Sequence, residues 1–322
     1  MKLEEIGFYT LSDDRARFLS RSSPMMRGEI IITDRCNFAC PYCRGIRPDC
    51  KGQMPTDEVC RIIRLWASDG LRNIRFSGGE PTLHNGLTSM VAVAKANGVR
   101  NVAISTNGSA DWNLYRDLIS CGANDFSVSL DACCSSFGDK MSGVNGYFDK
   151  VCDNIRRLSL TPLVYVTVGV VLNEMNVDEL ANIVKFADSL GVDDIRIIPS
   201  AQYNRMLASA ASLNPDLVRR YPILSYRVNH IRNNVPVRGL CSADCHKCHL
   251  VQDDSAVAGN FHFPCIIALR EGCLPIGKIG PNMREERIEW SRTHDTFLDP
   301  ICRKNCLDVC VAFNNRVEKL KE

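Results

Sequence analysis

Three cysteines, Cys36, Cys40 and Cys43, are spaced CxxxCxxC directly after an apolar run from Gly28 to Thr33. Three thiolates at this spacing can hold three irons of a [4Fe–4S] cluster and leave the fourth iron without a protein ligand. An open metal position is where a substrate or cofactor coordinates, which distinguishes catalytic from structural metal sites. From this triplet alone, a zinc site completed by a distant Cys or His is an alternative.

Small and polar residues follow three later apolar runs. The first run ends in Gly78-Gly79-Glu80-Pro81, the next in Ser105-Thr106-Asn107-Gly108, and the third in Ser129-Leu130-Asp131. Glycines at the end of a strand let the backbone approach a ligand closely. A carboxylate beside them can accept hydrogen bonds from an ammonium group.

The cysteine triplet and these three motifs together resemble the radical S-adenosylmethionine (SAM) superfamily, in its order and spacing, from about Gly28 to Pro199. The resemblance implies that Cys36, Cys40 and Cys43 hold a [4Fe–4S] cluster whose open iron is chelated by the amine and carboxylate of SAM. It also implies an enzyme that reductively cleaves SAM to a 5′-deoxyadenosyl radical, which abstracts hydrogen from an unactivated C–H bond. The electron would come from a one-electron donor such as flavodoxin or ferredoxin.

The same resemblance assigns residues to SAM. Glu80, with the backbone of Gly78 and Gly79, would take the amino group. Tyr42 would pack against the adenine, and Asn173 would neighbour the ribose or adenine. The positions that would line the ribose and carboxylate are Thr106, Asn107, Ser129 and Asp131.

Apolar strands alternate with amphipathic helices, which predicts an α/β fold with a parallel sheet and right-handed crossovers. Strands are expected near 29–33, 73–77, 101–105, 124–130, 163–171 and 194–198, and helices near 56–69, 86–97, 111–120, 147–158 and 177–189. Six units are fewer than the eight of a closed barrel. The resemblance implies a partial (β/α)6 barrel, and the polar motifs all lie at strand ends where parallel sheets bind ligands.

Eight of the seventeen cysteines lie in the last 82 residues. Their layout resembles the "twitch" domain, a shortened form of the SPASM extension, in which a β-hairpin and a helix hold an auxiliary [4Fe–4S] cluster. The ligands implied here are Cys248, Cys265, Cys302 and Cys306. A second auxiliary cluster, or zinc held by the same four thiols, are alternatives. No role is assigned to Cys241, Cys245, Cys273 and Cys310.

The predicted domains are a polar, irregular lead-in at 1–27, the partial barrel at 28–200, a connecting helical segment at 201–240, and the Cys-rich domain at 241–322. The start of the chain is unlike a secretion signal, and the longest apolar run is too short to span a bilayer. We therefore expect a cytoplasmic protein with no membrane partner, whose thiols serve as metal ligands rather than disulfides.

The remaining cysteines are interpreted as packing residues. Cys60, Cys121 and Cys152 fall at apolar positions of expected helices, where a buried thiol is inert. Cys50 and the Cys133-Cys134 pair are assigned to loops. The stretch from Leu217 to Ala243 has five arginines and no acid, so it is either a solvated helix face or a wall that receives an anionic group.

The leading hypothesis is an oxidative radical SAM enzyme that modifies a peptide or protein side chain, or a small hydroxylated metabolite. About 27 residues precede the first strand, fewer than the leader-binding module of many peptide-modifying relatives. One alternative is a molybdenum-cofactor-type nucleotide cyclase, although the end Val317–Glu322 lacks that family's glycine-rich tail. A tRNA-modifying enzyme is another, but a net charge of +2 without a basic and aromatic cluster favours no nucleic-acid partner. A non-catalytic iron–sulfur or zinc scaffold would not need the motif at Glu80.

Overall fold

The computed structural model describes residues 13–45, 52–200 and 208–321, so Cys50 lies outside the described residues. The chain divides into two compact units. The first comprises Met1–Arg35, Gly45–Val102 and Arg238–Glu322, and the second comprises Cys36–Arg44 and Ala103–Val237.

The first unit contains a sheet with the strand order β2-β1-β7-β8-β9. Its strands are β1 (Arg27–Thr33), β2 (Asn73–Gly78), β7 (Asp254–Ala258), β8 (Phe261–Phe263) and β9 (Gly277–Lys278). β1 pairs in parallel with both β2 and β7, and the β7-β8-β9 part is antiparallel. β1 lies between β2 and β7 and is buried on both faces, in agreement with its apolar run Ile30, Ile31 and Ile32. The hairpin expected near the C-terminus therefore continues the sheet that begins at β1.

The helices of the first unit come from three separate parts of the sequence. They are α1 (Asp13–Phe18), α2 (Thr56–Ser68), η3 (Pro81–Leu83), α3 (Leu87–Ala96), η5 (His249–Gln252), α11 (Ile266–Arg270), α12 (Met283–Thr293), α13 (Pro300–Asn305) and α14 (Asp308–Lys319). The sequence predicted an irregular lead-in where α1 forms. This short helix is fixed by tertiary contacts, because Arg15 forms an ion pair with Asp253 at 2.5 Å and Ala16 packs in a cluster with Phe313.

The second unit contains the parallel strand order β3-β4-β5-β6, of which β3 begins at the boundary between the units. The strands are β3 (Asn101–Thr106), β4 (Asp125–Ser129), β5 (Tyr165–Leu172) and β6 (Asp194–Pro199). Register places Ser105, Ser127, Thr167 and Asp194 side by side, so one face of the sheet is polar. Alternation puts buried apolar residues such as Phe126 on the opposite face.

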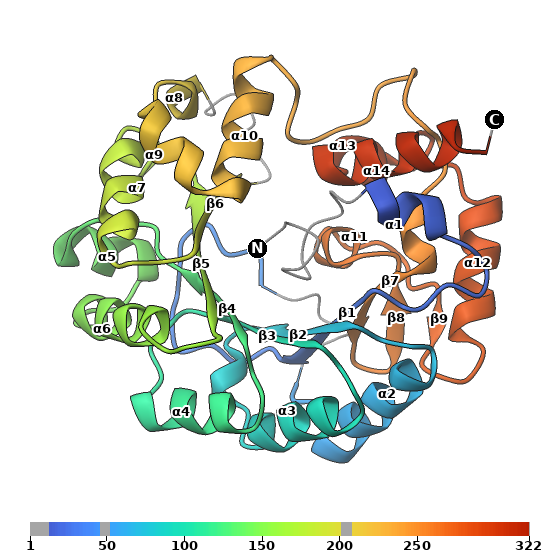
Figure 1. Ribbon diagram of the computed structural model, residues 1–322, viewed down its shortest axis with the longest axis horizontal. Helices are drawn as coiled ribbons and strands as arrows, with labels where there is room; N and C mark the ends of the chain where they lie inside the picture. Colours follow the sequence, from blue (N-terminus) through green and yellow to red (C-terminus); the bar gives the residue numbers. More distant parts are fainter. Residues whose placement is uncertain (1–12, 46–51, 201–207, 322) are drawn as a thin grey trace. The chain divides into compact units, whose positions relative to one another are not determined.

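Helices surround these strands in the second unit. They are α4 (Trp112–Ser120), α5 (Ser135–Ser142), α6 (Phe148–Ser159), α7 (Leu180–Ser189), α8 (Ala208–Ala211), α9 (Pro215–Arg220) and α10 (Pro222–Arg232). Figure 1 shows α4, α6 and α7 on one side of strands β4, β5 and β6. Asp194 at the start of β6 accepts hydrogen bonds from the backbone N–H of Ile223, in the first turn of α10, and so links this helix to the strand.

The α/β class and the parallel strands are confirmed. All six predicted strands are present, and their ends differ from the expected ones by two residues or fewer. Among the described residues, no helix has the length and apolar character needed to cross a membrane.

Candidate active site and metal centres

The CxxxCxxC segment forms a loop of the second unit. Cys36 and Cys43 are exposed and Cys40 is partly buried. Burial, together with the charges of Asp131, Cys43 and Cys36, raises the pKa of the Cys40 thiol to about 11, so the three sulfurs are close enough to interact electrostatically. The loop is fastened by the hydrogen bond from Ala39 N–H to Ser142 O, at 2.8 Å. A set of three neighbouring thiols on one fastened loop fits the donor chemistry of an iron–sulfur cluster.

Asn107, after β3, lies beside this loop. Its Nδ2 donates to Asn37 Oδ1 at 2.9 Å and lies 4.0 Å from the Cys36 sulfur. Its Oδ1 accepts from the Ser109 hydroxyl, which itself accepts from Asn37 Nδ2 at 2.8 Å. The structure therefore places Asn107 next to the first cysteine, where it orients the loop.

The Thr106 side chain, by contrast, makes its hydrogen bonds within the folded chain. It is buried, its hydroxyl lies 3.2 Å from the Tyr115 hydroxyl, and it accepts from Gly108 N–H at 3.1 Å. Asn173 is also buried: its Oδ1 accepts from Met175 N–H and its Nδ2 donates to Val171 O. Both side chains shape the loops at the ends of their strands.

Tyr42 and Asp131 are brought together, which the sequence did not predict. The Tyr42 hydroxyl donates to Asp131 Oδ2, while Asp131 Oδ1 accepts from Val171 N–H at 2.6 Å. Burial raises the pKa of Asp131 to about 6, against the two hydrogen bonds that lower it. The pair links the cysteine loop to the ends of β4 and β5. Ser129, two residues earlier, is exposed.

Gly78, Gly79 and Glu80 lie in the first unit, at the end of β2. A Cβ added to Gly78 would lie 2.3 Å from Thr33 O, and one added to Gly79 would lie 2.3 Å from Arg35 O. Glycine is thus required here by the close approach of the chain that follows β1. Glu80 is 1% exposed, and its Oε1 accepts from Thr82 N–H at 3.1 Å and from the Thr82 hydroxyl at 2.6 Å.

Arg270, at the end of α11, is a residue that sequence reasoning missed. It donates from Nη2 to Gly78 O at 3.1 Å and from Nη1 to Gly45 O at 3.2 Å. A side chain from the Cys-rich region thereby holds the glycine segment. Nothing in the local sequence around Arg270 distinguishes it, because the contact joins residues almost two hundred positions apart.

The C-terminal thiols gather into one group in the first unit. Burial raises the pKa of Cys265, and the nearby charges of Cys310, Cys248 and Cys302 raise it further. Burial also raises the pKa of Cys248 to about 12, with Cys310 again contributing. The four predicted ligands are therefore close enough to interact electrostatically, and the structure adds Cys310 to this group.

Cys310 was left without a role by the sequence analysis. The interaction between the two thiols raises the pKa of Cys306 and lowers that of Cys310, so they are close neighbours. The spacing of four residues gave no helical signal, because Cys306 precedes α14 in extended backbone and Cys310 lies in the first turn of that helix. Five thiols exceed the four that one cluster needs. Cys302 also lies with His294 and Asp299, with their ligand atoms within 4.8 Å of one another.

A buried cation lies close to these thiols. Arg27, at the start of β1, forms an ion pair with Asp254 at 2.5 Å. Burial alone would lower the pKa of Arg27, but Asp254 outweighs it and the charge of Cys310 raises the pKa further. A positive charge at this position offsets part of the negative charge that several thiolates would carry.

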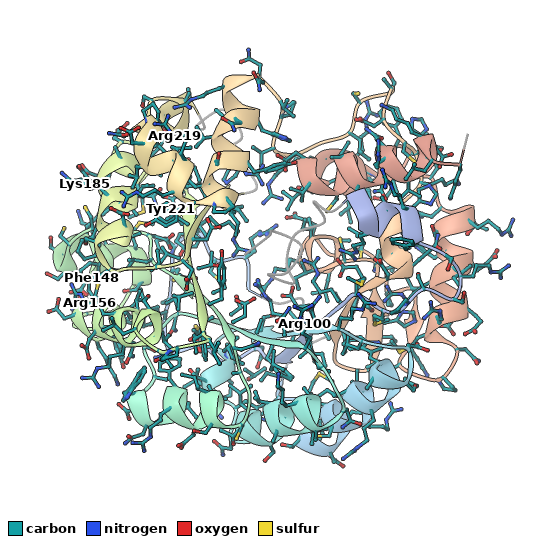
Figure 2. All side chains as sticks on the ribbon, in the orientation of Figure 1. Arg100, Phe148, Arg156, Lys185, Arg219 and Tyr221 are labelled. Carbon is teal, nitrogen blue, oxygen red and sulfur yellow. The ribbon has the colours of Figure 1, made fainter. Side chains whose placement is uncertain are left out.

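The arginine-rich stretch after Leu217 is largely engaged in local contacts. Arg219 pairs with Asp216 on the same helix and is exposed, and Arg220 pairs with Asp188 at 2.9 Å. Arg232 donates to two backbone carbonyls. Figure 2 shows the labelled Arg219 on the outer side of α9, which supports the interpretation of this part as a solvated helix face.

Residues 30–187 match the family model of the radical SAM superfamily. The chain contains a radical SAM domain. It is accordingly an enzyme of the radical SAM type, whose cofactors are a [4Fe–4S] cluster and SAM. The matched range includes the cysteine loop and all the polar motifs at the strand ends.

Curated relatives of the radical SAM chain include two named as probable GTP 3′,8-cyclases. That of Sulfurisphaera tokodaii is 25% identical over 243 residues, which cover 70% of this chain and 77% of the relative. That of Saccharolobus islandicus is 29% identical over 177 residues, which cover 54% of this chain and 57% of the relative. The match with the second relative thus spans little more than half its length.

Solved structures share the fold of this radical SAM chain. Streptococcus suis SuiB bound to precursor peptide SuiA gives a TM-score of 0.59 at 14% identity, covering 87% of this chain and 66% of that one. The structure of anSMEcpe with bound AdoMet gives 0.57 at 14% identity, covering 91% and 96%. At these identities the likeness establishes the fold.

Proposed function

We propose that this radical SAM enzyme performs a net oxidation of a peptide or protein side chain, or of a small hydroxylated metabolite. The observation that carries the proposal is the second group of thiols, around Cys248, Cys265 and Cys310, in addition to the loop with Cys36, Cys40 and Cys43. An auxiliary [4Fe–4S] cluster in this group would accept an electron, which an oxidative outcome requires. Sulfur-only donors suit such a cluster or zinc.

The residues described above would have different roles in the reaction. When bound, the cluster and SAM supply reductive cleavage of SAM to a 5′-deoxyadenosyl radical that abstracts hydrogen from the substrate. Cys36, Cys40 and Cys43 would hold the cluster, and Glu80 with the glycine backbone would take the SAM amino group. Arg270 keeps that glycine segment in place through Gly78 O.

Tyr42 and Asp131 would act as a positioning pair. Asp131 holds the Tyr42 hydroxyl and is itself held by Val171 N–H. Tyr42 directly precedes Cys43, so the pair restrains the loop on which the cluster would be bound. Ser129 and Asn107 would lie beside the ribose and carboxylate of SAM, while Thr106 and Asn173 would support the loops that carry those contacts.

The fold shared with SuiB, which was solved with a precursor peptide, supports a peptide substrate. A one-electron donor of the flavodoxin or ferredoxin type would reduce the cluster. The iron–sulfur content tests the auxiliary centre: we expect about eight irons per chain, and about four in the Cys36/Cys40/Cys43→Ala variant. Four irons in the native chain and none in the variant would remove the auxiliary cluster from the proposal.

A nucleotide cyclase is a second candidate function, because relatives 25–29% identical to this chain are named as probable GTP 3′,8-cyclases. Anaerobic incubation with SAM, a reductant and GTP separates the two candidates. A cyclised guanosine product formed along with 5′-deoxyadenosine would establish the cyclase and overturn the oxidative proposal. Formation of 5′-deoxyadenosine without GTP conversion would favour the oxidative enzyme.

Glu80→Gln tests whether the proposed SAM site is used, with Glu285→Gln on the surface of α12 as its control. We expect the first variant to lose formation of 5′-deoxyadenosine while keeping its iron, and the control to retain both. Equal rates of SAM cleavage in the two variants would contradict the assignment of Glu80.

A further inference from the structure

The cysteine motif Cys241-x3-Cys245-x2-Cys248 contains a thiol, Cys245, that is not among the ligands proposed for the auxiliary centre. The Cys245 sulfur lies near two other metal-ligating side chains, His249 and Glu318. His249 Nε2 is 2.6 Å from Glu318 Oε2, and the Cys245 sulfur is 4.0 Å from the same oxygen. One ligand atom from each residue lies within 4.8 Å of the other two.

The fold holds this group in place by backbone contacts to α14, while the Cys245 sulfur also lies 3.4 Å from Lys247 N and O. Asn315 Oδ1, on α14, accepts from Cys245 N–H at 2.6 Å. Asn314 Oδ1 accepts from His249 N–H at 2.8 Å. Glu318 lies one turn further along the same helix. The three side chains are therefore positioned by backbone hydrogen bonds to α14, which is the preorganisation that a metal site needs.

Cys245 and Cys248 belong to different groups, although they are three residues apart. Among the charges that shift the pKa of Cys248 are those of Cys310 and Asp254. Burial raises the pKa of Cys245 and the hydrogen bond from the Lys247 backbone lowers it, while the nearby charges are those of Glu318, Lys321 and Lys247. The sulfur of Cys245 lies 4.0 Å from Glu318 Oε2, and within 4.8 Å of a ligand atom of His249.

We propose that Cys245, His249 and Glu318 are the ligands of a mononuclear metal site that binds Zn²⁺. One thiolate, one imidazole and one carboxylate form a donor set that Zn²⁺ accepts at tetrahedral geometry. Hard cations such as Mg²⁺ prefer oxygen donors, and iron–sulfur clusters prefer thiolates. His249 is 5% exposed, whereas the Glu318 side chain is 48% exposed, so the fourth position faces solvent and takes water.

Lys321 regulates access to this site in the metal-free form. Its Nζ lies 3.1 Å from His249 Nδ1 and donates to it, so Nε2–H donates to Glu318. Binding of Zn²⁺ at Nε2 moves that proton to Nδ1, displaces Lys321, and releases the Cys245 thiol proton to solvent. Lys321→Met, which removes the competing ammonium, therefore strengthens zinc binding.

The test uses the full chain after anaerobic loading with iron and sulfide, so that the auxiliary thiols are occupied before Zn²⁺ is added. Zinc is titrated by calorimetry, and the bound metal is examined by X-ray absorption at the zinc edge. We expect one zinc per chain, with one sulfur at about 2.3 Å and nitrogen or oxygen at about 2.0–2.1 Å. Absence of zinc uptake, or a shell of four sulfurs, would overturn the site.

Variants identify the ligands. Cys245→Ser and His249→Gln should each weaken zinc binding by more than about 100-fold, since loss of an outer-shell partner alone costs about 10–100-fold. Cys134→Ser, an exposed thiol of the second unit, is the matched control and should bind zinc as the wild type does. Unchanged zinc affinity in Cys245→Ser would refute the assignment. So would about four further irons that disappear in that variant, because they would mark a second cluster instead.

Discussion

Gly79→Ala is the substitution whose effect follows most directly from the structure. The added Cβ would lie 2.3 Å from Arg35 O and 2.6 Å from Asp34 O, both backbone atoms that cannot rotate away. The chain at Gly79 must therefore shift, which breaks the hydrogen bonds from Gly79 N–H to Thr33 O at 2.8 Å and from Glu80 N–H to Arg35 O at 2.7 Å.

The magnitude follows from these two effects. Overpacking of this kind costs about 1–3 kcal/mol, and each of the two hydrogen bonds contributes about 0.5–1.5 kcal/mol. The free energy of unfolding should therefore fall by about 2–6 kcal/mol. Because Glu80 moves with the backbone, SAM affinity should fall by at least about tenfold, which corresponds to 1.4 kcal/mol.

Gly280→Ala is the matched control. An added Cβ at Gly280 meets nothing within 4 Å, and its backbone is outside the left-handed region. Urea unfolding of the cluster-free chain, followed by tryptophan fluorescence, gives the stability of both variants, and calorimetry of the loaded enzyme gives the SAM dissociation constant. If Gly79→Ala matches Gly280→Ala in both measurements, the close approach described here does not constrain this segment.

Three further substitutions address the other contacts. Asp131→Asn removes a buried carboxyl whose folded-state pKa is raised to about 6, so the wild type should lose stability as the pH rises from about 4 through 6. Unfolding measurements at pH 4.5 and 7 should show a smaller loss in the variant, and parallel profiles would contradict this. Cys310→Ser should lower the iron content by about four atoms per chain if Cys310 is an auxiliary ligand, whereas Cys121→Ser should leave it unchanged. Equal iron content in the two variants would exclude Cys310 as a ligand of the auxiliary cluster. Arg270→Met removes two hydrogen bonds to backbone carbonyls and should weaken SAM binding by about tenfold with iron unchanged; wild-type affinity would show that Gly78 needs no such support.

The parallel strands could be predicted from the sequence because their apolar runs are short, continuous and separated by amphipathic helices. Helix α5 and helix α1 were missed, since neither is long or strongly periodic. The pairing of β7 with β1 could not be predicted either, because it joins segments more than two hundred residues apart. Local periodicity contains no information on such a contact.

Site residues were predicted by type and position, but their partners were not. Thr106 and Asn173 fit the polar pattern at strand ends, yet their side chains accept hydrogen bonds from the backbone of the loops that follow. Short polar side chains at the end of a strand can satisfy local backbone groups as readily as a ligand, and the sequence pattern is the same in both cases.

The spare thiols show why cysteine spacing alone underdetermines a metal centre. The resemblance to the twitch domain implied four ligands and left Cys310 and Cys245 without a role, although both lie beside other metal-ligating side chains in the structure. Cys310, in the first turn of α14, is an electrostatic neighbour of Cys306, whereas the Cys245 sulfur lies 4.0 Å from Glu318 Oε2. The two cases differ in the donors that converge with each sulfur: thiols for Cys310, and an imidazole and a carboxylate for Cys245. Donor type decides between iron–sulfur and mononuclear zinc chemistry. We therefore expect Cys245 to serve a different metal from Cys310, and from its own motif neighbour Cys248.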